Sequence, residues 1–181
     1  MEWASVNNLN PKSFTCGYCG KIVASASGFF TSDQPQRFIY VCPNCKHPTL
    51  FEDDKQIPGV APGVEVPHLP VDVDSLYREA RNCVAIASYT SAVLSCRKLL
   101  MHIAVSQGAA ANKSFVEYVE HLADKGFVPP NGRGWIDHIR KKGNEANHEI
   151  KLMSRADAEE LISFAEMLLK FIYEFPQRVP K

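Results

Sequence analysis

No stretch of the sequence contains eighteen consecutive apolar residues, and the N-terminus lacks a charged segment followed by an apolar run. We therefore expect neither a membrane span nor a secretory signal peptide. An excess of one charge is also absent, because 20 Lys and Arg residues balance 20 Asp and Glu residues, so the net charge predicts no nucleic-acid or membrane partner. Six cysteines without a secretory context favour metal binding over disulfides, and a reducing, cytoplasmic location.

The composition changes near residue 52, which predicts two parts and a connection. Residues 1–52 contain two cysteine pairs and the short runs RFIYV and PTLF, which are typical of strands. Residues 53–72 contain four of the twelve prolines and no helical period, so we expect an extended, fairly stiff tether. Residues 73–181 have the apolar spacing of helices throughout.

The cysteine pairs follow the spacing C-x2-C-x22-C-x2-C and consist of Cys16, Cys19, Cys42 and Cys45. Two-residue spacing lets both thiolates of a pair reach one ion from a tight turn, and two pairs complete a tetrahedral S4 shell that zinc prefers. Four thiolates leave no open position for water, so the predicted Zn²⁺ is structural. An iron centre of the rubredoxin type uses the same ligands. Residues 1–52 resemble a zinc ribbon, and zinc ribbons bind either nucleic acid or protein.

About five helices are expected after the tether, so the predicted fold class is mainly α: a β zinc ribbon followed by a helical bundle. The helix from Tyr89 to Ser106 has an apolar stripe that leaves Arg97 and Lys98 outside it. Ser114 and Glu117 form a capping box, and the last helix is expected to start after Ser154 and to end near Glu174. This last helix is apolar over most of its circumference, so it lies either at the centre of the bundle or in a homodimer interface.

The most polar helical stretch is WIDHIRKKGNEANHEI, residues 135–150. Between residues 133 and 155 there are six Lys and Arg residues against three acidic ones. On a continuous helix Arg140, Asn144 and His148 lie on one side. In a structural interpretation, Asn144 and Asn147 cap a helix break and His148 bonds a neighbouring carbonyl. Alternatively, Arg140 binds phosphate together with Lys141 and Lys142, or His148 performs acid–base catalysis while Arg140 stabilises the charge.

Three segments carry a family resemblance: EARNCVAIASYTSAVLSCRKLL, FVEYVEHLADKGFVP and HIRKKGNEANHE. Residues 70–175 resemble a bacterial helical family of unknown function whose members occur alone, behind zinc ribbons or fused to restriction-enzyme subunits. That family is assigned to the HEPN superfamily (higher eukaryotes and prokaryotes nucleotide-binding). Active members are dimeric, metal-independent ribonucleases, and many others only bind or dimerise.

The resemblance implies site residues as well as a fold. Arg140 and His148 would take the roles of the catalytic Arg and His, although seven residues separate them here, one more than the motif has. Arg97 fits the second helix of the family, while Met101 replaces its usual Glu. We therefore expect Arg97, Arg140, Asn144 and His148 to line a phosphate-accepting groove, with Lys141 and Lys142 beside it.

The favoured interpretation is a protein that binds or acts on RNA or DNA, with a role in bacterial defence against foreign genetic elements. One alternative is a non-catalytic dimeric adaptor that contacts a protein partner through its ribbon. The other alternative is a metal-independent ribonuclease that uses Arg140 and His148.

Overall fold

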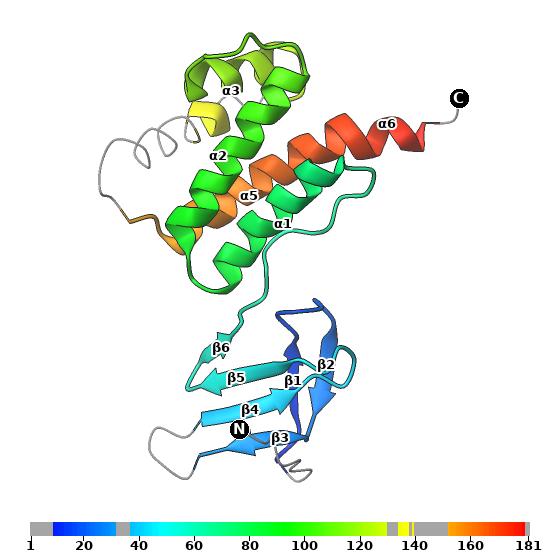
Figure 1. The fold of residues 1–181 in the computed structure, drawn as a ribbon, viewed down its shortest axis with the longest axis vertical. Coiled ribbons are helices and arrows are strands. Elements are labelled where there is room, and N and C mark those ends of the chain that lie inside the picture. Colours follow the sequence, from blue (N-terminus) through cyan, green and yellow to red (C-terminus); the bar gives the residue numbers. More distant parts are fainter. Residues whose placement is uncertain (1–8, 32–36, 130–133, 138, 140–151, 180–181) are drawn as a thin grey trace. The chain divides into compact units, whose positions relative to one another are not determined.

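The computed structural model describes residues 9–31, 37–129, 134–137, 139 and 152–179. The chain divides into two compact units, residues 1–61 and 62–181. Figure 1 shows that strands make up the described secondary structure of the first unit, while helices make up that of the second.

The N-terminal unit contains a two-stranded hairpin and a four-stranded antiparallel sheet with the strand order β3-β4-β5-β6. The predicted strand runs RFIYV and PTLF form neighbouring strands of this sheet, which confirms them as strands. The strands are β1 (Lys12–Thr15), β2 (Ile22–Ser25), β3 (Gly28–Phe30), β4 (Arg37–Val41), β5 (Pro48–Glu52) and β6 (Lys55–Ile57).

The core of this unit is small. Phe14, Tyr40 and Phe51 pack as a ring cluster, with the centroids of Phe14 and Phe51 5.2 Å apart. Leu9 completes the apolar part, and the two other buried members are the thiols Cys16 and Cys42. Because a core of this size buries little apolar surface, it contributes little of the free energy that folding requires.

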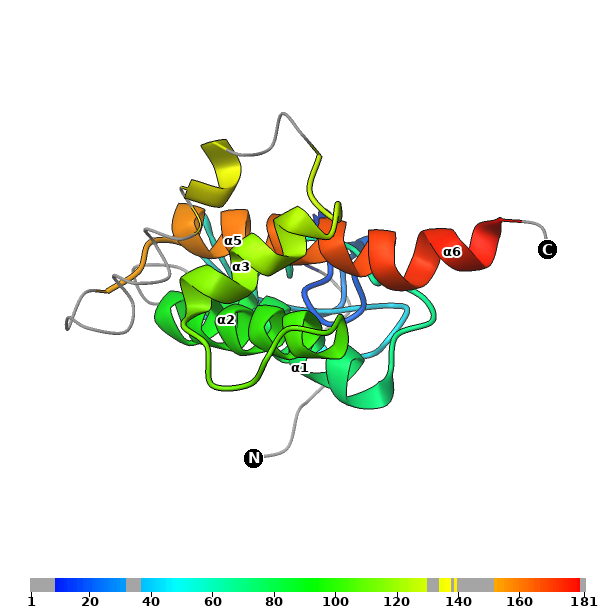
Figure 2. The ribbon, with the colours of Figure 1, turned by 90° about the horizontal axis from the view of Figure 1, so that it is seen from above.

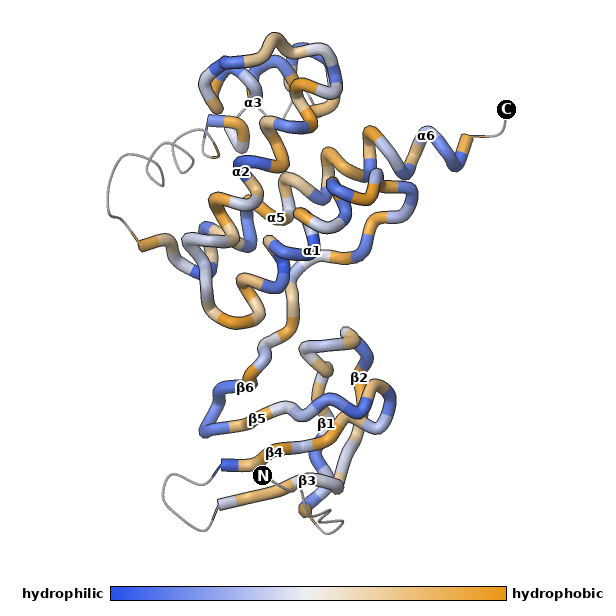
Figure 3. The backbone as a smooth tube through the Cα atoms, viewed as in Figure 1, coloured by the Kyte–Doolittle hydropathy of each residue, from blue (hydrophilic) through white to orange (hydrophobic). Residues whose placement is uncertain are grey.

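The helical unit is organised around one central helix. α2 packs against α1, α3 and α5, and α1 also packs against α5, as Figures 1 and 2 show from two directions. Figure 3 shows apolar and polar residues alternating along these helices, as packing on one side requires. The helices are α1 (Val71–Ala85), α2 (Tyr89–Ser106), α3 (Phe115–Asp124), α5 (Arg155–Leu169), the π-helical turn η2 (Lys170–Glu174) and α6 (Phe175–Arg178).

Two helix starts that the sequence predicted are confirmed. The Ser114 hydroxyl accepts a hydrogen bond from the Glu117 amide, and the Glu117 carboxylate accepts one from the Ser114 amide. Ser154 and Asp157 form the same reciprocal pair at the start of α5. The helical path does not end near Glu174 as expected, because Pro176 lies in the first turn of α6, where proline's missing N–H is tolerated.

The last helix is buried in its own unit, with Leu161, Phe164, Leu168 and Leu169 fully enclosed. This arrangement accounts for its apolar circumference without a second chain, and the homodimer stays a prediction. Phe171 lies at the turn that follows and remains 42% exposed.

The expectation of a mainly α chain is wrong. Helices account for 48% of the described residues and strands for 16%, in two antiparallel sheets. The strands are only three to five residues long, so they leave a weaker periodic signal than the helices do.

The segment expected to be a tether, residues 53–72, forms contacts along its length. It contains β6, and the Gln56 side-chain amide donates to the backbone oxygens of Thr15 and Pro58. Further along, Arg81 donates to the backbone oxygens of Pro62 and Gly63.

The same segment is also held by α1 and α5. Tyr77 donates to the backbone oxygen of Val64, whose amide donates to the Glu166 carboxylate. Gly63 has a φ of +70°, and a Cβ placed there would lie 2.6 Å from the Glu166 carboxylate. Glycine is therefore required at this point of the chain.

Candidate metal centre

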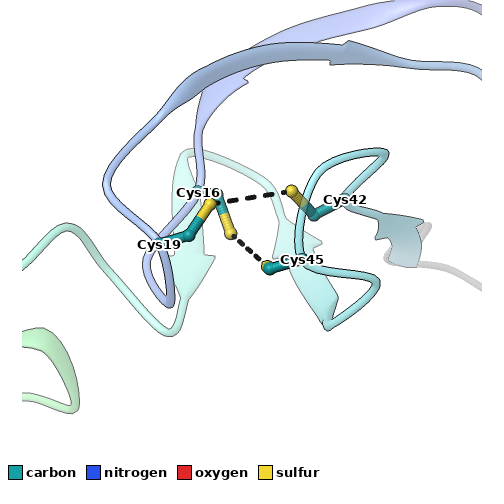
Figure 4. A group of neighbouring side chains, drawn as sticks. All are labelled: Cys16, Cys19, Cys42 and Cys45. Atoms are coloured by element: carbon teal, nitrogen blue, oxygen red, sulfur yellow. Dashed lines mark hydrogen bonds between the residues drawn. The ribbon is translucent and has the colours of Figure 1, made fainter.

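The four predicted ligands, Cys16, Cys19, Cys42 and Cys45, lie together (Figure 4), and all four Sγ atoms are within 4.8 Å of one another. One pair comes from the turn between β1 and β2, and the other comes from the turn between β4 and β5. Neither remaining cysteine joins the cluster. Cys96 is fully buried and Cys83 is half-buried, both on helices.

The two turns repeat one backbone pattern. The amide of Gly20 donates to the Cys16 oxygen over 2.8 Å, and the amide of Lys46 donates to the Cys42 oxygen over 2.9 Å. Gly20 and Lys46 both adopt left-handed conformations, with φ of +67° and +63°. We call these turns the first and second knuckle. Because the turn geometry is equivalent in both, each knuckle presents its two thiols to the same point.

The sulfur separations fit a tetrahedral metal shell. Sγ of Cys16 lies 3.6 Å from Sγ of Cys45, and Sγ of Cys19 lies 3.9 Å from Sγ of Cys42. Zinc–thiolate bonds of about 2.3 Å in a tetrahedron place the sulfurs about 3.8 Å apart. The arrangement is therefore compatible with a structural zinc ion bound by four thiolates.

The surroundings of the thiols shift their pKa values in opposite directions. The backbone amide of Lys21, helped by the side chain of Asn44, lowers the pKa of Cys19 to about 6. Burial, together with hydrogen bonds to the three other thiols, raises the pKa of Cys45 to about 12. Four negative charges at one point repel each other, so complete ionisation requires a cation among the thiolates.

The first knuckle is also packed against the chain that follows β6. A Cβ added at Gly17 would lie 2.4 Å from the backbone oxygen of Gly59 and 2.5 Å from that of Pro58. No side chain fits at that distance. Residues 58 and 59, which the sequence placed in a tether, therefore help to fix the turn that carries Cys16 and Cys19.

Arg97, predicted to lie off the apolar stripe of α2, is instead buried, and its residue is only 7% exposed. Its guanidinium carbon lies 4.2 Å from the centroid of the Phe115 ring, at the start of α3. Nη1 is buried and has no hydrogen-bond partner among the residues that the structure describes. Among the described residues no carboxylate pairs with Arg97, and burial lowers its pKa, although a guanidinium remains charged at neutral pH.

The other residues of the predicted phosphate groove, Arg140, Lys141, Lys142, Asn144 and His148, lie outside the described residues. The structure therefore does not test whether they approach Arg97, and their roles in binding or catalysis stay predictions.

One feature of the knuckles was not predicted. The rings of Tyr18 and His47 stack with their centroids 4.5 Å apart and their planes 26° apart. His47 is exposed, and its ring packs on that of Tyr18. The repeated pattern of the two C-x2-C turns is the signal that would have placed these residues side by side.

Comparisons with known proteins give one match. The family model described as "Domain of unknown function (DUF4145)" matches residues 78–181, more than half of the chain. No curated protein and no solved structure matches the chain. Among the described residues, no helix has the length and apolar character that crossing a bilayer requires.

Proposed function

The chain belongs to the DUF4145 family, and from this premise we propose that it is a nucleic-acid-binding protein whose N-terminal unit is folded by a structural zinc ion. The family description agrees with the expected helical family of unknown function and names no activity. The assignment to the HEPN superfamily and the role in defence remain our predictions.

The four-thiol cluster carries the first half of the proposal. A complete shell of four thiolates leaves no site for water or substrate, so the ion stabilises the fold and takes no part in a reaction. Iron would fit the same four sulfurs, and the two metals differ in colour because ferric thiolate centres absorb visible light. Metal analysis and an absorption spectrum of the purified protein separate them.

The single observation that carries nucleic-acid binding is the buried Arg97 without an anionic partner among the described residues. Removing a cation from water costs several kcal/mol, whereas the contact with the Phe115 ring returns about 0.5–2 kcal/mol. An uncompensated guanidinium therefore destabilises the fold. A phosphate group would supply the missing charge and accept the hydrogen bond that Nη1 can donate.

Replacing this cation tests the proposal. Binding of fluorescein-labelled RNA and DNA oligonucleotides is measured by anisotropy at several salt concentrations, with the metal-loaded full chain. Arg97→Met keeps the length of the side chain and removes the charge. We expect weaker binding and a slope of log K against log salt that is shallower by about 0.7–0.9, the loss of one phosphate contact. The melting temperature should be unchanged or higher, because a buried unpaired charge has been removed.

Lys98→Met is the matched control, because Lys98 is the exposed neighbour of Arg97 on α2. The control should leave the binding constant close to that of the native chain. An equal loss in both variants would show that net charge, and not Arg97, determines binding, which contradicts this part of the proposal. A native chain that binds no oligonucleotide would support the protein-binding adaptor instead.

The ribonuclease alternative depends on Arg140 and His148, and no described residue favours it. The same samples report on it directly, because cleavage would shorten the labelled RNA on a gel. Cleavage that persists in EDTA while zinc stays bound, and that is lost in both Arg140→Ala and His148→Ala, would establish that alternative.

A further inference from the structure

The stacked rings of Tyr18 and His47 lie on the two knuckles. Tyr18 lies between the ligands Cys16 and Cys19, and His47 follows Cys45 by two residues. The ring stack is thus formed by the same two turns that present the thiols. Binding of the metal by both knuckles therefore fixes the two rings against each other.

This ring pair is not part of the core. Tyr18 is 53% exposed, and neither ring belongs to the buried cluster around Phe14, Tyr40 and Phe51. His47 is anchored by its Nδ1, which lies 3.0 Å from the backbone oxygen of Cys45. A large exposed ring held in one orientation offers a flat apolar surface to another planar group.

The surroundings of the ring pair are basic. Lys21 and Lys46 follow the first and second knuckle and are exposed, and Lys21 reaches across to the Asn44 side chain over 3.3 Å. Residues 9–31 and 37–51 contain no Asp or Glu. Among the described residues neither lysine pairs with a carboxylate, so both ammonium groups are available to an anionic partner.

We propose that the Tyr18–His47 ring pair, with Lys21 and Lys46, is a binding site for single-stranded nucleic acid on the N-terminal unit, in addition to the phosphate contact of Arg97. This inference rests on the proposed function. It adds which surface of the N-terminal unit contacts nucleic acid, and that the nucleic acid is single-stranded. The rings would stack on an unpaired base and the lysines would contact the adjoining phosphates, a combination that single strands satisfy. In a duplex both faces of each internal base are already stacked, so this surface can meet only the phosphates.

The test is anisotropy with a labelled twelve-nucleotide single strand and with the duplex of the same sequence, using the metal-loaded full chain. The native chain should bind the single strand at least about tenfold more tightly. Tyr18→Leu removes the ring but keeps an apolar side chain, and it should weaken single-strand binding by about 5- to 150-fold. Tyr18→Phe keeps the ring and should bind like the native chain.

Phe30→Leu is the matched control, because Phe30 lies in the same unit and is similarly exposed, at 55%, but is remote from the cysteines in sequence. It should leave affinity unchanged. Lys46→Gln should make the salt dependence shallower by about one phosphate contact. Metal content is measured for every variant. If the Tyr18→Leu chain contains less metal than the native chain, the affinity of the His47→Gln chain is used instead. A single-strand affinity of His47→Gln equal to that of the native chain overturns the inference.

The outcomes separate the two proposals. A native chain that binds neither strand form defeats the proposed function, and this inference with it. Binding that Arg97→Met weakens but Tyr18→Leu leaves intact keeps the proposed function and overturns the ring site. Equal affinity for duplex and single strand likewise overturns the ring site. Loss in Tyr18→Leu, recovery in Tyr18→Phe and no change in Phe30→Leu support it.

Discussion

The two units are stabilised by different forces. Among the residues that the structure describes, the helical unit encloses twenty-seven buried apolar residues in one cluster, whereas the N-terminal unit encloses six, and two of those six are metal-ligand candidates. Burial of apolar surface is thus sufficient for the helices and insufficient for the strands. We therefore expect the N-terminal unit to obtain much of its folding free energy from an ion bound by its four thiols, and we expect the helical unit not to respond to the metal.

The largest expected effect tests this difference at a ligand. Cys42→Ser removes one of four thiolates, and binding of a structural zinc ion contributes about 10–16 kcal/mol in small domains. We expect residues 9–57 to lose protection against amide hydrogen exchange, while α2 and α5 keep theirs. Mass spectrometry of exchanged peptides measures both in one sample.

Cys83→Ser is the control for this substitution, because Cys83 is a half-buried cysteine on α1 outside the cluster. It should retain full metal content and full protection of the strands. A Cys42→Ser chain that stays protected over residues 9–57 would mean that the small aromatic core is sufficient, and the comparison between the units would be wrong.

A smaller effect on stability is expected from a substitution in the core of the helical unit. Phe164 is fully buried on α5 and packs edge-to-face against Trp135 with 5.0 Å between the ring centroids. Phe164→Ala should lower the free energy of unfolding of the helical unit by about 3–5 kcal/mol, because it leaves a cavity. Urea denaturation followed by circular dichroism measures this, and a chromogenic chelator reports whether metal release is unchanged.

Phe171→Ala provides the matched control, because this Phe lies at the end of the same helical path but is 42% exposed. Its effect should stay within about 0.5 kcal/mol. If metal were released at lower urea concentration in Phe164→Ala than in the native chain, the two units would be coupled in stability.

The features that the sequence predicted correctly depend on short spacings. The C-x2-C pairs, the Ser114 and Ser154 capping boxes and the stripe of α2 each require only a few neighbouring residues, so local chemistry decides them. α2 even begins and ends at the predicted residues, Tyr89 and Ser106. The meeting of the two pairs was predicted because one ion would need all four ligands.

The features that were missed depend on contacts distant in sequence. Arg97 was placed off the apolar stripe because periodicity cannot show that Phe115, eighteen residues later, covers it. The Tyr18–His47 stack joins two turns whose separation in the sequence is about half the length of the N-terminal unit. For the same reason, the proline content of residues 53–72 does not reveal that this segment bonds Tyr77, Arg81 and Glu166.

The smallest expected effect concerns the local chemistry of the helical unit, at the capping box of α3. Ser114→Ala removes the hydroxyl that accepts from the Glu117 amide and should lower the free energy of unfolding by about 1 kcal/mol. The Ser114 amide, and then the Lys113 ammonium, lower the pKa of Glu117 to about 2, below its usual 4.5. The contribution of Glu117 is therefore present at neutral pH and is lost as the pH falls from about 4.5 to about 2.

Urea denaturation of the native chain and of Glu117→Gln across this pH range separates that contribution from other acid effects. The two stabilities should converge as the pH approaches 2, because the native carboxylate then becomes neutral like the amide. Ser163→Ala is the matched serine control, since Ser163 is exposed and its hydroxyl donates to the Glu159 backbone oxygen within α5. A difference between the native chain and Glu117→Gln that stayed constant with pH would show that the charge of Glu117 does not stabilise α3.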